Sequence, residues 1–206
     1  MELHVYFAFV VATSIMIALP GPSVILTIAH SISFGRMHGI VTVAGATLGI
    51  AVQLLVAAIG LTSILNAVAG AFDLLRWAGA AYLVYLGIKQ WRNSNEPLEL
   101  VTSNVSKKNI FVQGVVVTIF NPKSLVFIAA FLPQFIDIGR PLVLQFTLIV
   151  STFLVITFTV TSVWALTAGS AREFLRSQRA IKAVSRTSGG LMILAGMGLA
   201  AARRSN

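Results

Sequence analysis

Long apolar runs constrain this chain more than any other feature of its sequence. Six of them lie near residues 4–31, 39–62, 72–91, 110–133, 142–168 and 187–202. A helix of about 20 apolar residues matches the hydrocarbon thickness of a bilayer. Of the 206 residues, 57% are hydrophobic and only 10% are charged, whereas soluble domains carry about 25% charged residues. The sequence therefore predicts an all-α integral membrane protein with six transmembrane helices, of which the last is the shortest.

The net charge of +9 follows a pattern that orients a membrane protein and does not indicate a nucleic-acid partner. Ten Lys and Arg residues lie in the connectors after the first, third and fifth runs, against three on the other side of the bilayer, Arg140, Arg203 and Arg204. Because basic residues accumulate on the cytoplasmic side, we expect those connectors in the cytoplasm and both termini in the periplasm. The first run lacks a basic n-region and a cleavage site, which predicts a retained helix.

Two short motifs divide the chain into related halves. "LPGPS" at residues 19–23 is echoed by "FNPKS" at 120–124, an offset of 101 residues. We expect a single transmembrane domain over residues 1–206, with one repeat over about 1–91, a cytoplasmic linker over about 92–109 and a second repeat over about 110–206. Because each half has three spans, the second must be inverted relative to the first. Paired Gly/Pro interruptions in such halves point to a transporter's binding site.

Both motifs predict helices broken near the middle of the membrane. Proline lacks an N–H and clashes with the preceding turn, and irregular backbone survives in a bilayer only where protein or a wet cavity surrounds it. Asn121 is suited to cap a new half-helix with Pro122 in its first position, and Gly21 and Pro22 match these two roles. The half-helix N-termini would attract an anion, and the facing carbonyl ends would accept an ammonium group.

Lys123 strengthens this interpretation, because a lysine near the bilayer centre costs at least about 2.5–3.5 kcal/mol on insertion scales. The alternative is that the prolines only kink the helices while the lysine reaches toward the membrane surface or pairs with an acid. For two matched breaks plus a lysine we favour the functional interpretation. The predicted substrate-binding residues are Pro20, Gly21, Pro22, Ser23, Asn121, Pro122, Lys123 and Ser124, with Tyr82 as a further contact.

Other features favour packing. "GATLG" at residues 45–49 places Gly45 and Gly49 four apart, a spacing that lets helices approach closely; a cavity wall is the second interpretation. The motif supports contacts within or between subunits, so the oligomeric state stays open. Trp164 is expected to anchor the protein at the membrane interface, as are the other two tryptophans.

The sequence offers little to an enzyme or a metal site. It contains no cysteine, and its three histidines lack metal-ligand spacing. A phosphate-binding loop, a nucleophile elbow and a pair of catalytic acids are also missing. We therefore expect no enzymatic activity, no cofactor and no bound metal.

Four stretches together resemble the LysE/RhtB family of small amino-acid exporters, particularly its homoserine/threonine branch. They are "PGPS" at 20–23, "GIVTVAGATLGI" at 39–50, "WAGAAYLVYLGIKQWR" at 77–92 and "FNPKSLVFIAAFLPQFI" at 120–136. The resemblance implies secondary export of amino acids or their derivatives across the bacterial inner membrane, coupled to protons. For the coupling residue the sequence offers Asp73, Asp137 and His30 without choosing among them.

The substrate is expected to be uncharged overall. A cationic side chain would need an acid nearby, yet the cores of the first, second, fourth and fifth spans contain no Asp or Glu. This favours threonine, homoserine or a small aliphatic amino acid over lysine or arginine. The alternatives are a solute channel, which would show flux without saturation, and a non-transporting membrane scaffold protein.

Overall fold

The computed structural model describes residues 1–65, 69–92, 106–137, 139–170 and 178–201, and every regular element among them is helical. In chain order these elements are α1 (Leu3–Ala18), α2 (Pro22–Phe34), α3 (Arg36–Leu65), α4 (Ala69–Arg92), α5 (Lys107–Ile119), α6 (Pro122–Phe131), the 3₁₀ helix η1 (Leu132–Phe135), α7 (Leu142–Ser170) and α9 (Gln178–Ala201). The all-α prediction is confirmed for this part of the chain. The predicted linker lies mostly on residues 93–105, outside the described residues.

The helices are interrupted at both predicted breaks. Helices α1 and α2 are bent by 53° relative to each other, and α5 and the α6–η1 segment by 47°. Gly21 is the N-cap of α2 with Pro22 in its first turn, and Asn121 is the N-cap of α6 followed by Pro122. The Asn121 side chain accepts a hydrogen bond from the Lys123 backbone N–H at 3.1 Å. Each proline therefore starts a half-helix, because its missing N–H costs nothing in a first turn.

Two described helices, α3 and α7, are long and apolar enough by themselves to cross a membrane, over Arg36–Gly60 and Leu142–Ala168. The count rises to four if each bent pair is one span. Helix α9 begins at Gln178, ahead of the apolar run at 187–202, because its basic first turns consist of residues that readily form helix.

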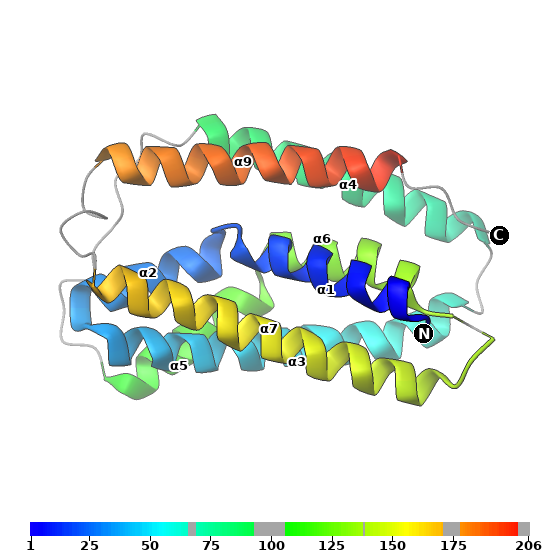
Figure 1. Cartoon of the computed structure of the whole chain (residues 1–206), viewed down its shortest axis with the longest axis horizontal. Helices are drawn as coiled ribbons and strands as arrows, with labels where there is room; N and C mark the ends of the chain where they lie inside the picture. Colours follow the sequence, from blue (N-terminus) through cyan, green and yellow to red (C-terminus); the bar gives the residue numbers. More distant parts are fainter. Residues whose placement is uncertain (66–68, 93–105, 138, 171–177, 202–206) are drawn as a thin grey trace.

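The helices run roughly along one axis (Figure 1). Helix α3 packs against α2, α5 and α7, while α7 also contacts α1 and α2. Helices α4 and α9 pair with each other at one side, and α4 joins this pair to the rest through α6. Helix α1 begins and α9 ends at the same end of the bundle (Figure 1).

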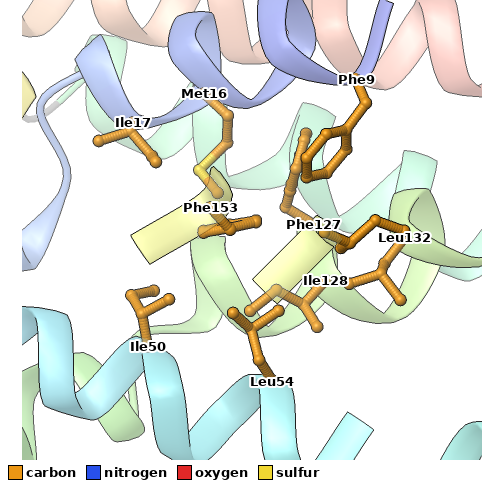
Figure 2. Packing of buried hydrophobic residues seen from close by; sticks show 10 residues of the cluster. Phe9, Met16, Ile17, Ile50, Leu54, Phe127, Ile128, Leu132 and Phe153 are labelled. Atoms are coloured by element: carbon orange, nitrogen blue, oxygen red, sulfur yellow. The ribbon is translucent and has the colours of Figure 1, made fainter. Parts of the chain in front are cut away.

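The main apolar core lies beside the α1–α2 break. Figure 2 shows the Met16 side chain of α1 among residues of α3, α6 and α7, including Phe127 and Phe153. The Phe127 ring also stacks on Phe131, with ring centroids 4.6 Å apart. This core packs the end of α1 against the second half of α6.

Small residues bring α3 and α5 into backbone contact. A Cβ at Gly45 would overlap the Phe111 carbonyl, and one at Gly49 would lie 2.7 Å from Thr118 Cβ. Close approach of this kind is what the "GATLG" motif predicts. The motif thus lies inside the described subunit, on the face of α3 that holds the end of α5 in place.

Candidate functional site

The two breaks lie against each other. The Ser23 hydroxyl of α2 accepts hydrogen bonds from Thr118 Oγ1 of α5 at 2.9 Å and from Asn121 Nδ2 at 3.0 Å. Thr118, Asn121 and the neighbouring Ser124 are buried. Residues about 100 positions apart therefore form one polar cluster, which we call the break cluster: Ser23, Thr118, Asn121, Lys123 and Ser124.

Lys123 crosses from one break to the other. Its side chain starts in the first turn of α6, and its Nζ donates to the backbone carbonyls of Met16 at 2.8 Å and Leu19 at 2.5 Å. These carbonyls lie at the C-terminal end of α1, where the last C=O groups lack helical partners and the helix dipole has its negative pole. Only 4% of the Lys123 surface is exposed. The lysine therefore neither pairs with an acid among the described residues nor extends toward the membrane surface.

Gly21 makes room for this contact. A Cβ added there would lie 3.2–3.3 Å from the last atoms of the Lys123 side chain, Cδ, Cε and Nζ. The backbone of the first break thus passes directly over the lysine. Pro20 and Gly21 are buried beside it, while Pro122 is half-buried.

Further side chains cap the remaining helix ends. Trp164 Nε1 of α7 donates to the Ala18 carbonyl at 3.2 Å, so this tryptophan also contacts the end of α1. At the other break, Gln53 Nε2 of α3 donates to the carbonyls of Thr118 at 2.8 Å and Ile119 at 3.0 Å. Sequence reasoning missed Gln53 and Thr118. Gln53 has the only amide side chain in the apolar run at 39–62. Because an amide inside a membrane needs a hydrogen-bond partner, this isolated amide could have identified Gln53 from the sequence.

The two half-helix N-termini differ. In α6 the Asn121 carboxamide caps the Lys123 N–H, and the Ser124 hydroxyl donates back to the Asn121 carbonyl at 3.1 Å. In α2 the N-cap is Gly21, which supplies no side-chain acceptor. The N-terminus of α2 is therefore the end that retains capacity for an anion.

The remaining predicted residues lie elsewhere. Tyr82 is 37% exposed on α4, and its ring lies 5.9 Å from that of Tyr85, measured between centroids. Asp137 is half-exposed and bonds to Arg140 Nε at 3.0 Å and to the Gly139 N–H at 2.9 Å. Asp73 belongs to α4, but its side chain lies outside the described residues. No described contact joins Tyr82 or Asp137 to the break cluster.

His30 is buried on α2, seven residues after Ser23. Its Nδ1 lies 2.7 Å from Thr42 Oγ1 of α3, and that hydroxyl donates to the His38 carbonyl at 3.0 Å. Because a hydroxyl has one proton, Nδ1 is the donor of the first bond. Its Nε2 is buried and has no hydrogen-bond partner among the described residues. Within the described residues no group of three His, Asp or Glu side chains is arranged to hold a metal.

Comparison with known proteins finds similarity over nearly the whole chain. The family described as LysE type translocator matches residues 14–203, which include both breaks. A homoserine/homoserine lactone efflux protein of Salmonella typhimurium is 31% identical over 201 residues, covering 97% of this chain and 98% of the relative. An uncharacterized membrane protein of Vibrio cholerae is 31% identical over 205 residues, covering 98% of this chain and 100% of the relative. No solved structure matches.

Proposed function

Because the chain belongs to the LysE type translocator family, we propose that this multi-pass membrane protein exports small neutral amino acids or their derivatives from the cytoplasm. The expected substrates are threonine, homoserine and small aliphatic amino acids. Export is secondary-active and coupled to protons, with the substrate held at the break cluster and the adjoining ends of α1 and α2.

The observation that carries the proposal is that the carbonyl end of α1 already binds an ammonium group. Lys123 Nζ donates to the carbonyls of Met16 and Leu19. The same break that ends α1 begins α2, whose N-terminus lacks a side-chain cap. A zwitterion needs such a pair of opposite poles close together, one for its ammonium group and one for its carboxylate.

The charges of this site support a substrate with an uncharged side chain. Among the described residues, none of those that form the contacts at the breaks is an Asp or Glu. A cationic substrate side chain would move from water into a site that offers no counter-ion, which is costly in a membrane. The Salmonella relative is named for homoserine and its lactone, neither of which has a charged side chain.

The arrangement of helices supports six passes through the bacterial inner membrane. The passes are α1–α2, α3, α4, α5–α6, α7 and α9, which form two inverted three-helix repeats. In Figure 1 they run roughly along one direction, and the first begins at the same end of the bundle at which the last ends, as an even number of passes requires. With the basic connectors in the cytoplasm, both termini are periplasmic and the two breaks lie near mid-membrane.

An efflux assay in cells tests the function. Cells that express the protein, and matched cells that do not, are loaded with dipeptides containing threonine, homoserine, leucine or lysine, and the amino acids released into the medium are measured. We expect faster release of at least one neutral amino acid, with a rate that saturates as the internal concentration rises. Release of lysine alone, or of none of the four above the control, would contradict the proposal. A rate without saturation would favour a channel.

A further inference from the structure

Lys123 occupies the position that the proposed function assigns to the substrate's ammonium group. Its Nζ donates to two carbonyls at the end of α1, at 2.8 and 2.5 Å. The side chain reaches them by lying against Gly21, where a Cβ would be 3.2–3.3 Å away. Two ammonium groups cannot share the same pair of carbonyls, because like charges repel strongly away from water. A substrate can therefore bind there only if Lys123 leaves.

Lys123 can leave the α1 carbonyls only if an anion is present to pair with its ammonium group. It is buried, and the groups that surround the breaks supply hydroxyls, amides and backbone carbonyls but no acidic side chain among the described residues. Moving its charge off the carbonyls without a new partner leaves a buried cation uncompensated, which is strongly unfavourable. A substrate carboxylate, arriving beside the N-terminus of α2, is such a partner.

We propose that Lys123 is a tethered occupant of the substrate's ammonium subsite. In the empty carrier its ammonium group holds the Met16 and Leu19 carbonyls. When a zwitterion binds, the substrate's ammonium group takes these carbonyls and its carboxylate pairs with the released Lys123. The exchange moves no proton and leaves the net charge of the site unchanged, since the entering zwitterion is neutral. This inference rests on the proposed function.

The exchange determines which molecules are accepted. An amino-acid amide or lactone brings an ammonium group without a carboxylate, so it displaces Lys123 and leaves that cation unpaired. A hydroxy acid brings a carboxylate without an ammonium group, so it cannot replace Lys123 at the α1 carbonyls. Lys123 thus favours zwitterions over molecules that carry only one of the two charged groups, so we expect this chain to prefer homoserine to the lactone for which the Salmonella relative is also named.

The exchange also assists the return of the empty carrier. After release of substrate, Lys123 satisfies carbonyls that would otherwise be buried without a donor, which is costly. Net export includes this return of the empty protein in every cycle. Exchange of internal for external substrate does not, because the carrier then returns loaded.

The test uses the purified full-length chain in phosphatidylethanolamine–phosphatidylglycerol vesicles. Labelled homoserine is followed in two modes, net efflux and exchange against unlabelled homoserine. Inhibition by homoserine lactone and by the corresponding dihydroxy acid is compared with inhibition by unlabelled homoserine. The variants are Lys123→Met and Lys123→Arg, with Lys108→Met as the matched control, because Lys108 is an exposed lysine in the first turn of α5.

In the wild type we expect homoserine to inhibit at least about tenfold better than either analogue, as expected for loss of a buried charged partner. Lys123→Met should reduce net efflux about tenfold more than exchange, and should raise the relative affinity for the lactone by a similar factor. Lys123→Arg should retain the preference for the zwitterion, and Lys108→Met should behave as the wild type.

Two results overturn the inference while leaving the proposed function intact. One is a wild type that exports homoserine yet is inhibited equally by homoserine and its lactone, a measurement that does not depend on any variant folding. The other is a folded Lys123→Met protein whose net efflux and exchange fall equally with unchanged inhibitor preference. Absence of homoserine, threonine and leucine flux in the wild type would overturn the proposed function, and this inference with it.

Discussion

Ser23 and Asn121 lie 98 residues apart in the sequence, and their side chains form a hydrogen bond of 3.0 Å. Thr118 donates to the same Ser23 hydroxyl from one turn earlier, at 2.9 Å. This hydroxyl therefore connects the break of the first half to the break of the second. It places the uncapped start of α2 against the end of α5, where α6 and its lysine begin.

Ser23→Ala should lower stability, because it removes the acceptor used by both the Thr118 hydroxyl and the Asn121 amide. Leaving a buried donor without a partner costs about 1–3 kcal/mol. Thermal unfolding of the purified protein in detergent measures the loss, and efflux of threonine measures its effect on transport. The matched control is Ser151→Ala, whose exposed hydroxyl bonds only to carbonyls of its own helix. Equal unfolding temperatures for the two variants would contradict the connecting role of Ser23.

Gln53→Leu should loosen the end of α5. The substitution keeps an apolar side chain of similar size but removes the donor to the Thr118 and Ile119 carbonyls. The Thr118 carbonyl keeps the Asn121 N–H as a donor at 3.0 Å, but the Ile119 carbonyl loses the Gln53 amide, so we expect a loss of about 1–3 kcal/mol in stability. Gln134→Leu is the control, because the Gln134 amide bonds to the Ala130 carbonyl one turn earlier in the same segment. A smaller loss for Gln53→Leu than for Gln134→Leu would show that the cap is dispensable.

Gly45→Ala should separate α3 from α5. The added methyl group would overlap the Phe111 carbonyl, which is backbone and cannot turn aside. Overpacking of this kind costs about 1–3 kcal/mol. Gly60→Ala, on the same helix, is the matched control, because a Cβ there meets nothing within 4 Å. We expect this control to be neutral or stabilised by up to about 1 kcal/mol, since alanine favours helix over glycine. Both are measured by thermal unfolding in detergent.

The proton-coupling candidates make different predictions. Asp137→Asn should leave acceleration of export by a proton gradient unchanged, because the carboxylate is half-exposed and bonds to Arg140 and Gly139. His30→Asn should remove that acceleration, because its ring is buried and only Nδ1 has a partner. Vesicles with and without an imposed gradient give the comparison. Acceleration retained in His30→Asn but lost in Asp137→Asn would identify Asp137 as the coupling residue. Acceleration retained in both variants would favour Asp73.

The sequence by itself determined the class of fold and the places where its helices break. Apolar runs of membrane length predict helices, because only internal hydrogen bonding satisfies a backbone surrounded by lipid. Proline in "PGPS" and "NPKS" fixes the breaks for an equally local reason, since it lacks an N–H and is tolerated in a first helical turn. The capping role of Asn121 follows in the same way from its position next to Pro122.

Only the tertiary structure decided which donor meets which broken end. Lys123 could be recognised as a costly buried cation from its position, but its bonds to Met16 and Leu19 bring together residues more than 100 positions apart. Trp164 reaches the end of α1 from α7, and Gln53 reaches the end of α5 from α3. Such pairings depend on how the helices pack around the core between α1, α3, α6 and α7. Local sequence specifies where carbonyls lose their partners, whereas helix packing determines which distant side chains replace them.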